Sequence, residues 1–188
     1  MIRNLSKEEI DKIVDLHLAS LKEGALYQLG GNVLKIFYKE LFNDKNSFIL
    51  VYEQNKIIVG VAASTKDVEL LLRKIKRKHF LKIAFNILKK SLTSPKLPFK
   101  LLQKYPSGIK PELLFLFVDP VQRGKGIGEE LVKATSKRLK NMKIKKYKIT
   151  ILSSNFRGKK FYERIGFYKI KTYSSFGEER DVYLYKIK

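Results

Sequence analysis

Arg123-Gly124-Lys125-Gly126-Ile127-Gly128 is the stretch that decides the fold. It follows the apolar run Leu113 to Val118 and precedes the helix-patterned segment Glu129 to Leu139. Three alternate glycines lack the Cβ atoms that would keep a ligand from the backbone, so several N–H groups can converge on one anion. The start of the following helix adds partial positive charge at the same place. The sequence therefore predicts a strand, an anion-binding turn and a helix, with Arg123 and Lys125 supplying full charges for a phosphate or pyrophosphate.

The spacing of these glycines distinguishes between families of phosphate-binding loops. A P-loop needs Ser or Thr after Gly-Lys to hold a magnesium ion, whereas here Gly126 follows Lys125. A dinucleotide fingerprint needs G-x-G-x-x-G, which these glycines do not match. The stretch fits R/Q-x-x-G-x-G/A instead, and it resembles the acetyl-CoA pyrophosphate motif of the GNAT acyltransferase superfamily. Taken alone, such a match also describes a tight turn that caps a helix.

A second motif reads Asn155-Phe156-Arg157-Gly158-Lys159-Lys160-Phe161-Tyr162-Glu163-Arg164-Ile165-Gly166-Phe167. The strand-like run Tyr147 to Leu152 precedes it, Asn155 suits a helix N-cap, and Gly166 suits a helix C-terminus. An amphipathic helix that packs on the core would have the same pattern. The motif also resembles the last conserved block of GNAT enzymes, N-x-x-A-x-x-F-Y-x-x-x-G-F. Gly158 takes the position usually held by Ala, which weakens the helix by about 1 kcal/mol.

The composition excludes several kinds of site. At 188 residues the chain can bury a core without cross-links. It has no cysteine, which excludes disulfides, a thiol nucleophile and thiolate metal sites, and its only histidines are His17 and His79. We therefore expect no metal. No apolar run reaches the length of a membrane span, and Met1-Ile2-Arg3-Asn4 leads into a polar helix rather than a signal sequence, so we expect a cytoplasmic protein.

The net charge of +22 is concentrated in two blocks. Residues 66–110 carry 13 Lys/Arg against two acids, residues 131–162 carry 11 Lys/Arg and no acid, and the rest of the chain is neutral overall. Such a basic protein attracts nucleic acid or anionic membranes, although lysine-rich solvated faces give the same count. The second block surrounds the predicted anion-binding turn, where it would attract an anionic cosubstrate.

The order of predicted elements resembles the GNAT fold. A short strand, a capping box, two helices and a hairpin of two strands come first, and a second hairpin ends the chain. The short strand is Ile2 to Leu5, the capping box is Ser6-Lys7-Glu8-Glu9, and the first helix runs from there to Leu21. The second helix, Val33 to Phe42, follows the break at Gly30-Gly31-Asn32. The first hairpin joins Phe48 to Glu53 and Lys56 to Ser64 around Gln54-Asn55, and the second joins Phe167 to Tyr173 and Asp181 to Ile187 around Ser174 to Arg180. The resemblance implies a single GNAT domain over residues 1–188, α/β (α+β) in class, with a mixed, mostly antiparallel central sheet flanked by helices.

Residues 66–110 do not belong to the minimal GNAT fold. Their pattern predicts a basic helical insertion between the third and fourth strands. The spacing of Leu81, Phe85, Leu88 and Leu92 marks an amphipathic helix, and Val68, Leu71, Leu72 and Ile75 indicate earlier helical turns on a related face. The segment ends in a loop that contains Pro95, Pro98, Pro106 and Pro111. The insertion serves either as a lid or packing helix over the acceptor side, or as a peripheral contact with an anionic membrane or polyanionic partner.

The resemblance implies transfer of an acetyl group from the CoA thioester to an amine. Backbone N–H groups of the glycine turn would hold the pyrophosphate, and edge groups of the preceding strand would hold the pantetheine arm and the thioester carbonyl. The residues expected to bind acetyl-CoA are Leu116, Phe117, Val118, Arg123, Gly124, Lys125, Gly126, Ile127, Gly128, Asn155 and Tyr162.

Tyr162 and Glu112 are the candidate catalytic residues. Tyr162 lies where the family commonly places a tyrosine acid for the departing thiolate, although a phenol is a weaker acid than a thiol by about 2 kcal/mol; a tyrosine that only packs against the cosubstrate is the alternative. An alkyl amine is neutral in only about one molecule in 2,500 at pH 7, so a base assists. Glu112 has the family's separation from Arg123 for that role, and a simple strand-edge charge is its alternative.

Several acceptors stay open. His17, Leu29-Gly30-Gly31 and Phe37-Tyr38, with the basic insertion, loosely resemble a bacterial GNAT subgroup associated with surface-polysaccharide biosynthesis, which implies an amino-sugar acceptor. A protein or peptide amine is the alternative acceptor, but a basic enzyme repels polycations, so a small-molecule amine ranks first. The alternative is a module with the GNAT scaffold whose function is to bind nucleic acid or an anionic membrane through its basic surfaces. We expect a monomer or homodimer without a stable nucleic-acid complex.

Overall fold

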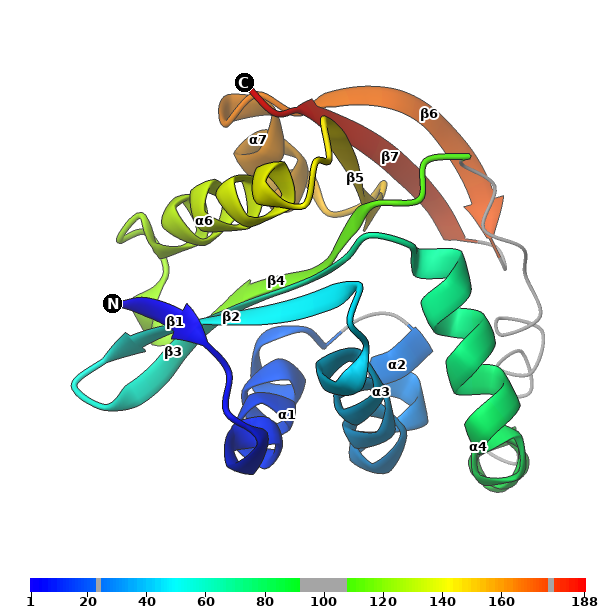
Figure 1. The fold of residues 1–188 in the computed structure, drawn as a ribbon. Helices are drawn as coiled ribbons and strands as arrows, with labels where there is room; N and C mark the ends of the chain where they lie inside the picture. The colour runs from blue at the N-terminus through cyan, green and yellow to red at the C-terminus, as the bar shows by residue number, and fades with distance from the viewer. Residues whose placement is uncertain (23–24, 92–107, 176–177) are drawn as a thin grey trace.

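One sheet organises the part of the chain that the computed structural model describes, which is residues 1–22, 25–91, 108–175 and 178–188 (Figure 1). Its strands are β1 (Ile2–Asn4), β2 (Ser47–Gln54), β3 (Ile57–Thr65), β4 (Glu112–Val118), β5 (Lys146–Leu152), β6 (Tyr168–Ser175) and β7 (Glu178–Lys186). The helices are α1 (Ile10–Ser20), α2 (Ala25–Leu29), α3 (Gly31–Asn43), α4 (Val68–Ser91), α6 (Ile127–Asn141) and α7 (Phe156–Arg164), with 3-10 turns η1 (Lys7–Glu9) and η2 (Pro120–Gln122).

The strand order in the sheet is β1-β2-β3-β4-β5-β7-β6. Neighbouring strands are antiparallel except β4 and β5, which run parallel because α6 crosses over between them. Helices α1, α2, α3 and α4 lie on one side of the sheet, and α6 and α7 lie on the other (Figure 1). The predicted α/β class and the mixed, mostly antiparallel sheet are therefore confirmed.

Each face of the sheet carries its own apolar core. The core on the α1 and α3 side centres on Ile13, Leu34, Tyr38 and Leu41, all fully or almost fully buried. The core under α6 is built around residues of α6 and β5 with the same degree of burial: Leu131, Leu139, Tyr147 and Ile149. Burying side chains of this size stabilises the fold by about 2 kcal/mol each.

Local details differ from the sequence expectation in four places. The β2–β3 turn lies at Asn55 and Lys56, one residue later than predicted, and both have positive φ (51° and 63°), as a type I′ hairpin turn requires. The short helix α2 was not predicted. Gly30, with φ of 86°, separates it from α3, which begins at Gly31 rather than Val33. The C-terminal hairpin is longer than predicted, since β6 reaches Ser175 and β7 begins at Glu178.

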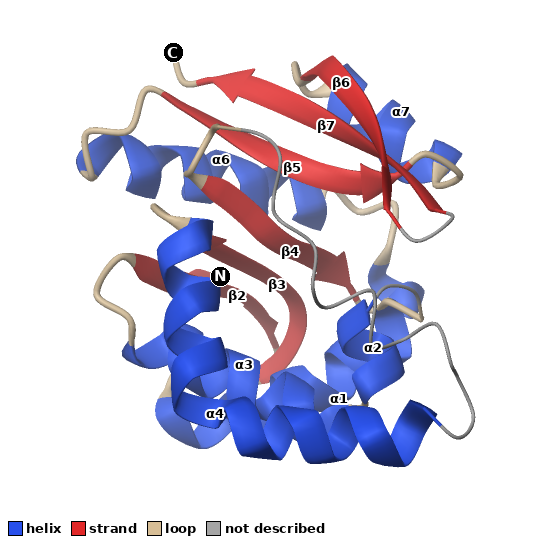
Figure 2. Ribbon diagram, turned by 90° about the vertical axis from the view of Figure 1, so that its right-hand side faces the viewer, coloured by secondary structure: helices blue, strands red, loops and turns tan. Residues whose placement is uncertain are grey.

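The predicted insertion between the third and fourth strands is α4, one helix with a kink at His79 (φ −121°, ψ 19°). Before the kink, Val68, Leu71 and Ile75 are buried against the helical layer. After it, the helix turns and runs along the lower edge of the molecule (Figure 2). The prediction of related apolar faces is wrong, because Leu81 and Phe85 after the kink are exposed. The side chain of Leu88 and the residues Leu92, Pro95, Pro98 and Pro106 lie outside what the structure describes.

Candidate active site

The strands β4 and β5 run in the same direction but pair only at their beginnings (Figure 2). Glu112 is in register with Lys148, and the Lys148 N–H donates to the carbonyl of Pro111 at 3.0 Å. Beyond this point no pairing between the two strands is found in the described residues, whereas the other edge of β4 is paired to β3 as far as Val118. The edge of β4 from Leu113 to Val118 therefore presents peptide groups that can bind an extended ligand.

A bulge in β4 lies at the start of this open edge. Ala63 of β3 is in register with Phe115 and Ser64 with Leu113, so Leu114 has no residue opposite it in β3. As a result Leu114 and Phe115 both pack into the core on the α1 side, while Leu116 packs into the core under α6. Bulges bend a strand and increase its twist, which accounts for the departure of β4 from β5 at this position.

The glycine turn follows directly after β4. Gly124 and Gly126 have φ of 83° and 82°, a conformation that other L-residues adopt at a cost, and no atom lies within 4 Å of where their Cβ atoms would be. Among the described residues, the backbone N–H groups from Arg123 to Gly128 have no hydrogen-bond acceptor, because the first bonds of α6 are those of Glu129 and Glu130 to Gly126. The turn and the helix start therefore form a row of donors that an anion can satisfy.

Gly128 brings the two predicted motifs together. A Cβ at this position would lie 3.3 Å from the ring of Phe161 on α7, closer than nearly all real contacts, and 4.0 Å from Val118. The missing Cβ of Gly128 therefore leaves room for the close approach of Phe161. The contact places the second motif beside the turn and the end of β4.

The side chain of Arg123 takes a structural role that its sequence position did not predict. Its guanidinium donates to the carbonyl of Val118 at 3.2 Å and to the carbonyl of Ser20, at the end of α1, at 2.9 Å. It thereby ties α1 to the start of the turn. Lys125 donates to the side chain of Gln122 at 2.7 Å.

Comparison with known proteins identifies this arrangement. Residues 107–179, which contain the open edge, the turn and both motifs, match the family model "Acetyltransferase (GNAT) domain". The match confirms the predicted GNAT superfamily, and with it the acyltransferase class and acetyl-CoA as cosubstrate.

Solved structures share the GNAT fold over the whole chain. An N-acetyltransferase from Staphylococcus aureus Mu50 has 17% identity and a TM-score of 0.66, covering 100% of this chain and 98% of that one. The PaiA N-acetyltransferase from Thermoplasma acidophilum, in complex with coenzyme A, has 16% identity and a TM-score of 0.65, covering 99% and 98%. A ribosomal-protein-alanine N-acetyltransferase from Brucella melitensis has 15% identity and a TM-score of 0.67, covering 99% of each chain. No curated protein matches the sequence.

The second GNAT motif forms α7, as predicted. Asn155 is its N-cap, and its side chain accepts from the N–H of Gly158 at 2.8 Å. A Cβ on Gly158 would lie 2.5 Å from the Cδ1 of Ile151, so the alanine that the family usually has here would require the Ile151 side chain to shift. Gly166 ends the helical segment with φ of 97°.

Tyr162 lies on α7 next to the residue that touches Gly128. Its ring packs edge-on against those of Phe161 and Phe167, each with centroids 5.1 Å away. Burial raises the pKa of its phenol well above the ordinary value of 10.0. The hydroxyl therefore stays protonated at neutral and moderately alkaline pH and can act as a hydrogen-bond donor.

Glu112 is buried where β4 and β5 separate, with 2% of its surface exposed. Its carboxylate lies 3.5 Å from the ammonium of Lys148, which is 1% exposed, and accepts from the hydroxyl of Thr150 at 3.1 Å. Burial lowers the pKa of Lys148, and the nearby carboxylate opposes that shift. The sequence did not predict either partner of Glu112, because Lys148 was counted in the basic block. The only signal was the alternation of side chains along β5, which places Lys148 and Thr150 on the same face of the sheet.

Tyr173 of the C-terminal hairpin interacts electrostatically with this buried carboxylate. Tyr173 of β6 is in register with Arg180 of β7. The pKa of Tyr173 is raised by burial, with an opposing effect of Arg180 and a further raising effect of Glu112. Arg180 also pairs with Glu178 at 3.1 Å. The sequence predicted a loop at Arg180, whereas Arg180 belongs to β7 and is in register with Leu152 of β5.

His17 and Tyr38, noted in the sequence for a subgroup resemblance, meet beneath β4. Nδ1 of His17 lies 2.8 Å from the Tyr38 hydroxyl, and its ring contacts those of Phe115 and Phe117 with centroids 4.8 and 5.1 Å away. Burial lowers the pKa of His17 to about 4, so the ring is neutral at pH 7. The pair supports the strand that carries the open edge.

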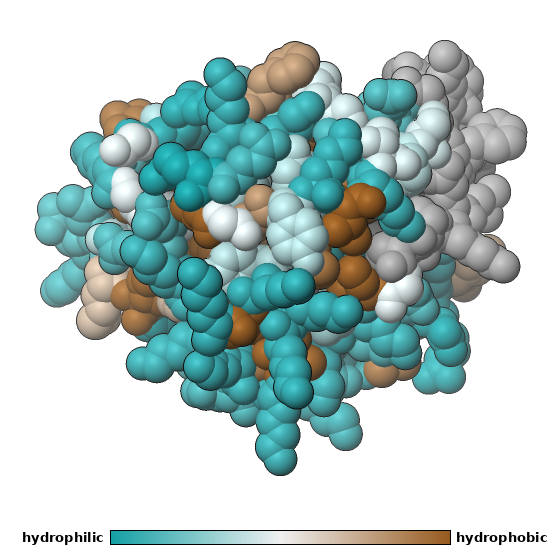
Figure 3. All heavy atoms as spheres, turned by 90° about the horizontal axis from the view of Figure 1, so that it is seen from above, coloured by the Kyte–Doolittle hydropathy of each residue, from teal (hydrophilic) through white to brown (hydrophobic). Residues whose placement is uncertain are grey.

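Most of the second basic block covers the outer side of α6 and the start of β5. The face seen from above is mainly hydrophilic (Figure 3). The exposed cations of the second basic block include Lys133, Lys137, Arg138, Lys140, Lys143, Lys145 and Lys146. Two hollows of about 270 and 290 Å³ lie between α6 and the β1–β2 edge, away from the glycine turn.

The described residues contain no group of three or more His, Asp or Glu side chains placed to hold a metal ion. No helix in the same part of the chain has the length and apolar character needed to cross a bilayer.

Proposed function

We propose that the protein transfers the acetyl group of acetyl-CoA to a primary amine of a small molecule. The observation that carries this proposal is the row of N–H donors from Arg123 to Gly128, which continues into the unpaired edge of β4. Donors of the turn would bind the pyrophosphate, and the edge at Leu116, Phe117 and Val118 would bind the amides of the pantetheine arm. Asn155 would act through the position of α7 rather than by direct contact, because its side chain caps that helix.

Glu112 is the proposed acceptor of the proton that the amine must lose. Its carboxylate is too buried to touch a substrate directly, but it accepts from the Thr150 hydroxyl, and Thr150 is half-buried. An ammonium group donating to Thr150 would pass its proton to that hydroxyl oxygen while the hydroxyl proton moves to Glu112. The neutral amine would then attack the thioester carbonyl. Deprotonation costs about 4.6 kcal/mol at pH 7 for an ordinary alkyl amine, which is why a relay is useful.

Tyr162 is the proposed donor to the departing sulfur. When the C–S bond breaks, the thiolate would accept the phenolic proton or a strong hydrogen bond from it. The raised pKa of Tyr162 favours the hydrogen-bonding role, since complete transfer from a buried phenol to a thiolate is uphill. The phenol remains a donor in either case, so both versions require the hydroxyl.

The proposed acceptor is a small amine, with amino sugars first. Tyr173, which interacts with the buried carboxylate, and Arg180, which is in register with Tyr173, would favour an acceptor that also carries hydroxyl or anionic groups. A protein or peptide amine is the second candidate, because one solved structure of the same fold is a ribosomal-protein-alanine N-acetyltransferase. The surplus of cations on this chain disfavours a polycationic peptide.

Calorimetry with acetyl-CoA, followed by thiol release with a panel of amines, tests the proposal. The panel should contain free and nucleotide-linked amino sugars, polyamines and peptides with free N-termini. We expect micromolar acetyl-CoA binding and turnover that is fastest with an amino sugar. Turnover only with peptides would reassign the acceptor, whereas absence of acetyl-CoA binding together with salt-sensitive binding to RNA or liposomes would favour a binding module.

A further inference from the structure

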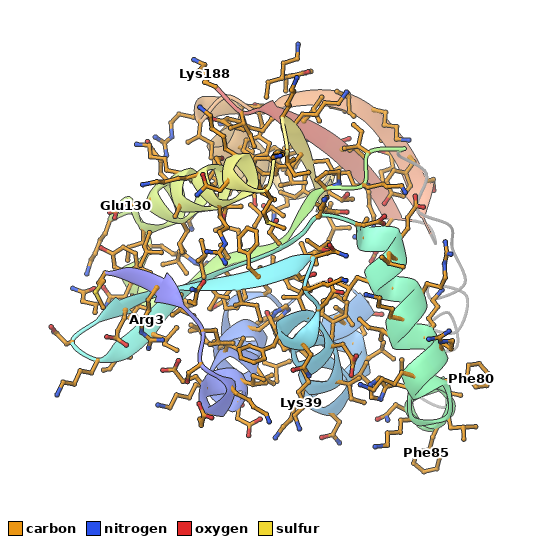
Figure 4. All side chains as sticks on the ribbon, viewed as in Figure 1. Arg3, Lys39, Phe80, Phe85, Glu130 and Lys188 are labelled. Atoms are coloured by element: carbon orange, nitrogen blue, oxygen red, sulfur yellow. The ribbon has the colours of Figure 1, made fainter. Side chains whose placement is uncertain are left out.

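The second half of α4 exposes large apolar side chains side by side. Phe80, Leu81 and Phe85 are 67%, 79% and 68% exposed, and they occupy one side of the helix after the kink at His79. We call these three residues the apolar ridge. Phe80 and Phe85 point outward from the lower end of α4, away from the body of the protein (Figure 4). Contiguous apolar surface of this kind usually marks a surface that binds something.

The charges around the apolar ridge all have one sign. From Arg73 to Lys90 the sequence contains eight Lys/Arg and no acid. Arg73, Arg77 and Lys82 are exposed, while Lys74 and Lys78 pair with Asp44 and Glu40 of the helical layer. The surface therefore combines exposed apolar side chains with exposed cations.

Contacts of His79 and Lys78 with Glu40 fix the position of the kink, and with it the position of the apolar ridge. His79 Nε2 lies 2.9 Å from a carboxylate oxygen of Glu40 on α3, and the Lys78 ammonium lies 2.7 Å from the same oxygen. The first half of α4 is anchored by buried Val68, Leu71 and Ile75. A fixed first half and an anchored bend present the ridge outward without any rearrangement of the core.

We infer that the apolar ridge docks the enzyme on an anionic lipid bilayer. Phe and Leu side chains enter the boundary between headgroups and acyl chains, and flanking Lys and Arg side chains bind anionic headgroups. A second copy of this chain fits poorly, because the same cations would face each other across the contact. Nucleic acid would satisfy the cations and could stack on the rings, but it offers no apolar partner for Leu81. The inference is independent of the proposed acceptor.

Sedimentation of the intact protein with vesicles tests the inference. We compare vesicles of pure phosphatidylcholine with an equimolar mixture of phosphatidylcholine and phosphatidylglycerol, at low and high salt. Binding is expected for the anionic vesicles only and should weaken with salt. The variant Phe80→Ser/Leu81→Ser/Phe85→Ser should lower the partition coefficient about tenfold or more. Ile57→Ser, at an exposed apolar residue (64%) in the β2–β3 hairpin, is the matched control and should bind like the parent protein.

A fluorescence reporter separates insertion from simple charge attraction. The chain has no tryptophan, so Phe85→Trp creates a single probe whose emission should shift to the blue on anionic vesicles. Equal binding by the triple variant, an unshifted probe on bound vesicles, or binding to single-stranded RNA or polyglutamate without binding to vesicles would each overturn the inference. Far-UV circular dichroism establishes that the triple variant is folded before these comparisons.

Discussion

The carboxylate of Glu112 and the ammonium of Lys148 lie 3.5 Å apart, almost completely buried, at the point where β4 and β5 separate. Each strand contributes one charge to the last position at which the two strands pair. Beyond it the facing edges of the two strands are unpaired in the described residues. The ion pair thus marks the inner end of the proposed binding site.

Removing only one member of this pair should be costly. Lys148→Met leaves the Glu112 carboxylate buried beside an apolar group, and we expect a loss of about 3 kcal/mol or more in the free energy of unfolding. The double variant Glu112→Gln/Lys148→Met should recover a large part of that loss, because no buried charge remains. Urea unfolding of the parent, both single variants and the double variant measures the coupling. Additive losses would show that the pair does not act as a unit.

Glu112 and Thr150 should act in the same step. Glu112→Gln and Thr150→Val are each expected to lower kcat by about 10²-fold with little change in the KM for acetyl-CoA. Thr150→Ser keeps the hydroxyl and should restore most of the rate, which a purely packing role of Thr150 would not explain. Unchanged kcat in Glu112→Gln would remove the proposed base.

The hydroxyl of Tyr162 should be required for release of the thiolate. Tyr162→Phe keeps the ring between Phe161 and Phe167 and is expected to lower kcat by about 10²-fold at every pH tested. Tyr185→Phe, in the same aromatic cluster, is the control and should keep near-parental activity. A Tyr162→Phe enzyme with full kcat across the pH range would leave the tyrosine with a packing role only.

Gly126 should be required for cosubstrate binding because its φ is 82°. Gly126→Ala imposes a strain of about 1 kcal/mol, and relief of that strain would turn the N–H row away from the anion. We expect the Kd for acetyl-CoA to rise about tenfold, with a smaller effect for Gly126→Asn, since asparagine tolerates this conformation. Gly166→Ala, at φ of 97° just after α7, is the control: similar strain should lower stability without a comparable effect on Kd.

His17 should make stability depend on pH. Its pKa is about 4 in the folded protein and near 6.5 when unfolded, so the unfolded chain binds the proton more readily. The stabilisation from a neutral His17 is fully present above pH 6.5 and is lost as the pH falls toward 4, by about 3 kcal/mol at most. His17→Gln should flatten this part of the profile in thermal or urea unfolding. An unchanged profile would mean that other groups dominate the acid sensitivity.

Local sequence was sufficient where the interactions are local. The alternate glycines, the cap at Asn155 and the left-handed Gly166 depend on neighbours a few residues away, so the turn, α6 and α7 could be predicted. The β2–β3 turn was predicted one residue early because Asn55 and Lys56 both adopt positive φ, which is unusual for lysine. The helix α2 was missed because five residues give too little periodicity to detect.

The sequence by itself determined that a strand, an anion-binding turn and a helix follow one another, because chirality and the missing Cβ atoms restrict such a turn to glycine. Only the tertiary structure decided what surrounds it. In the sequence Lys148 is one more cation of a basic block, but in the structure it is buried in register with Glu112. Arg123 is expected to help bind the pyrophosphate, but no sequence pattern showed that its guanidinium also ties α1 to β4. The spacing of Leu81 and Phe85 indicated an amphipathic helix, but only the structure shows that both side chains are exposed after the kink at His79. Each outcome depends on contacts between residues far apart in the chain, which no local pattern encodes.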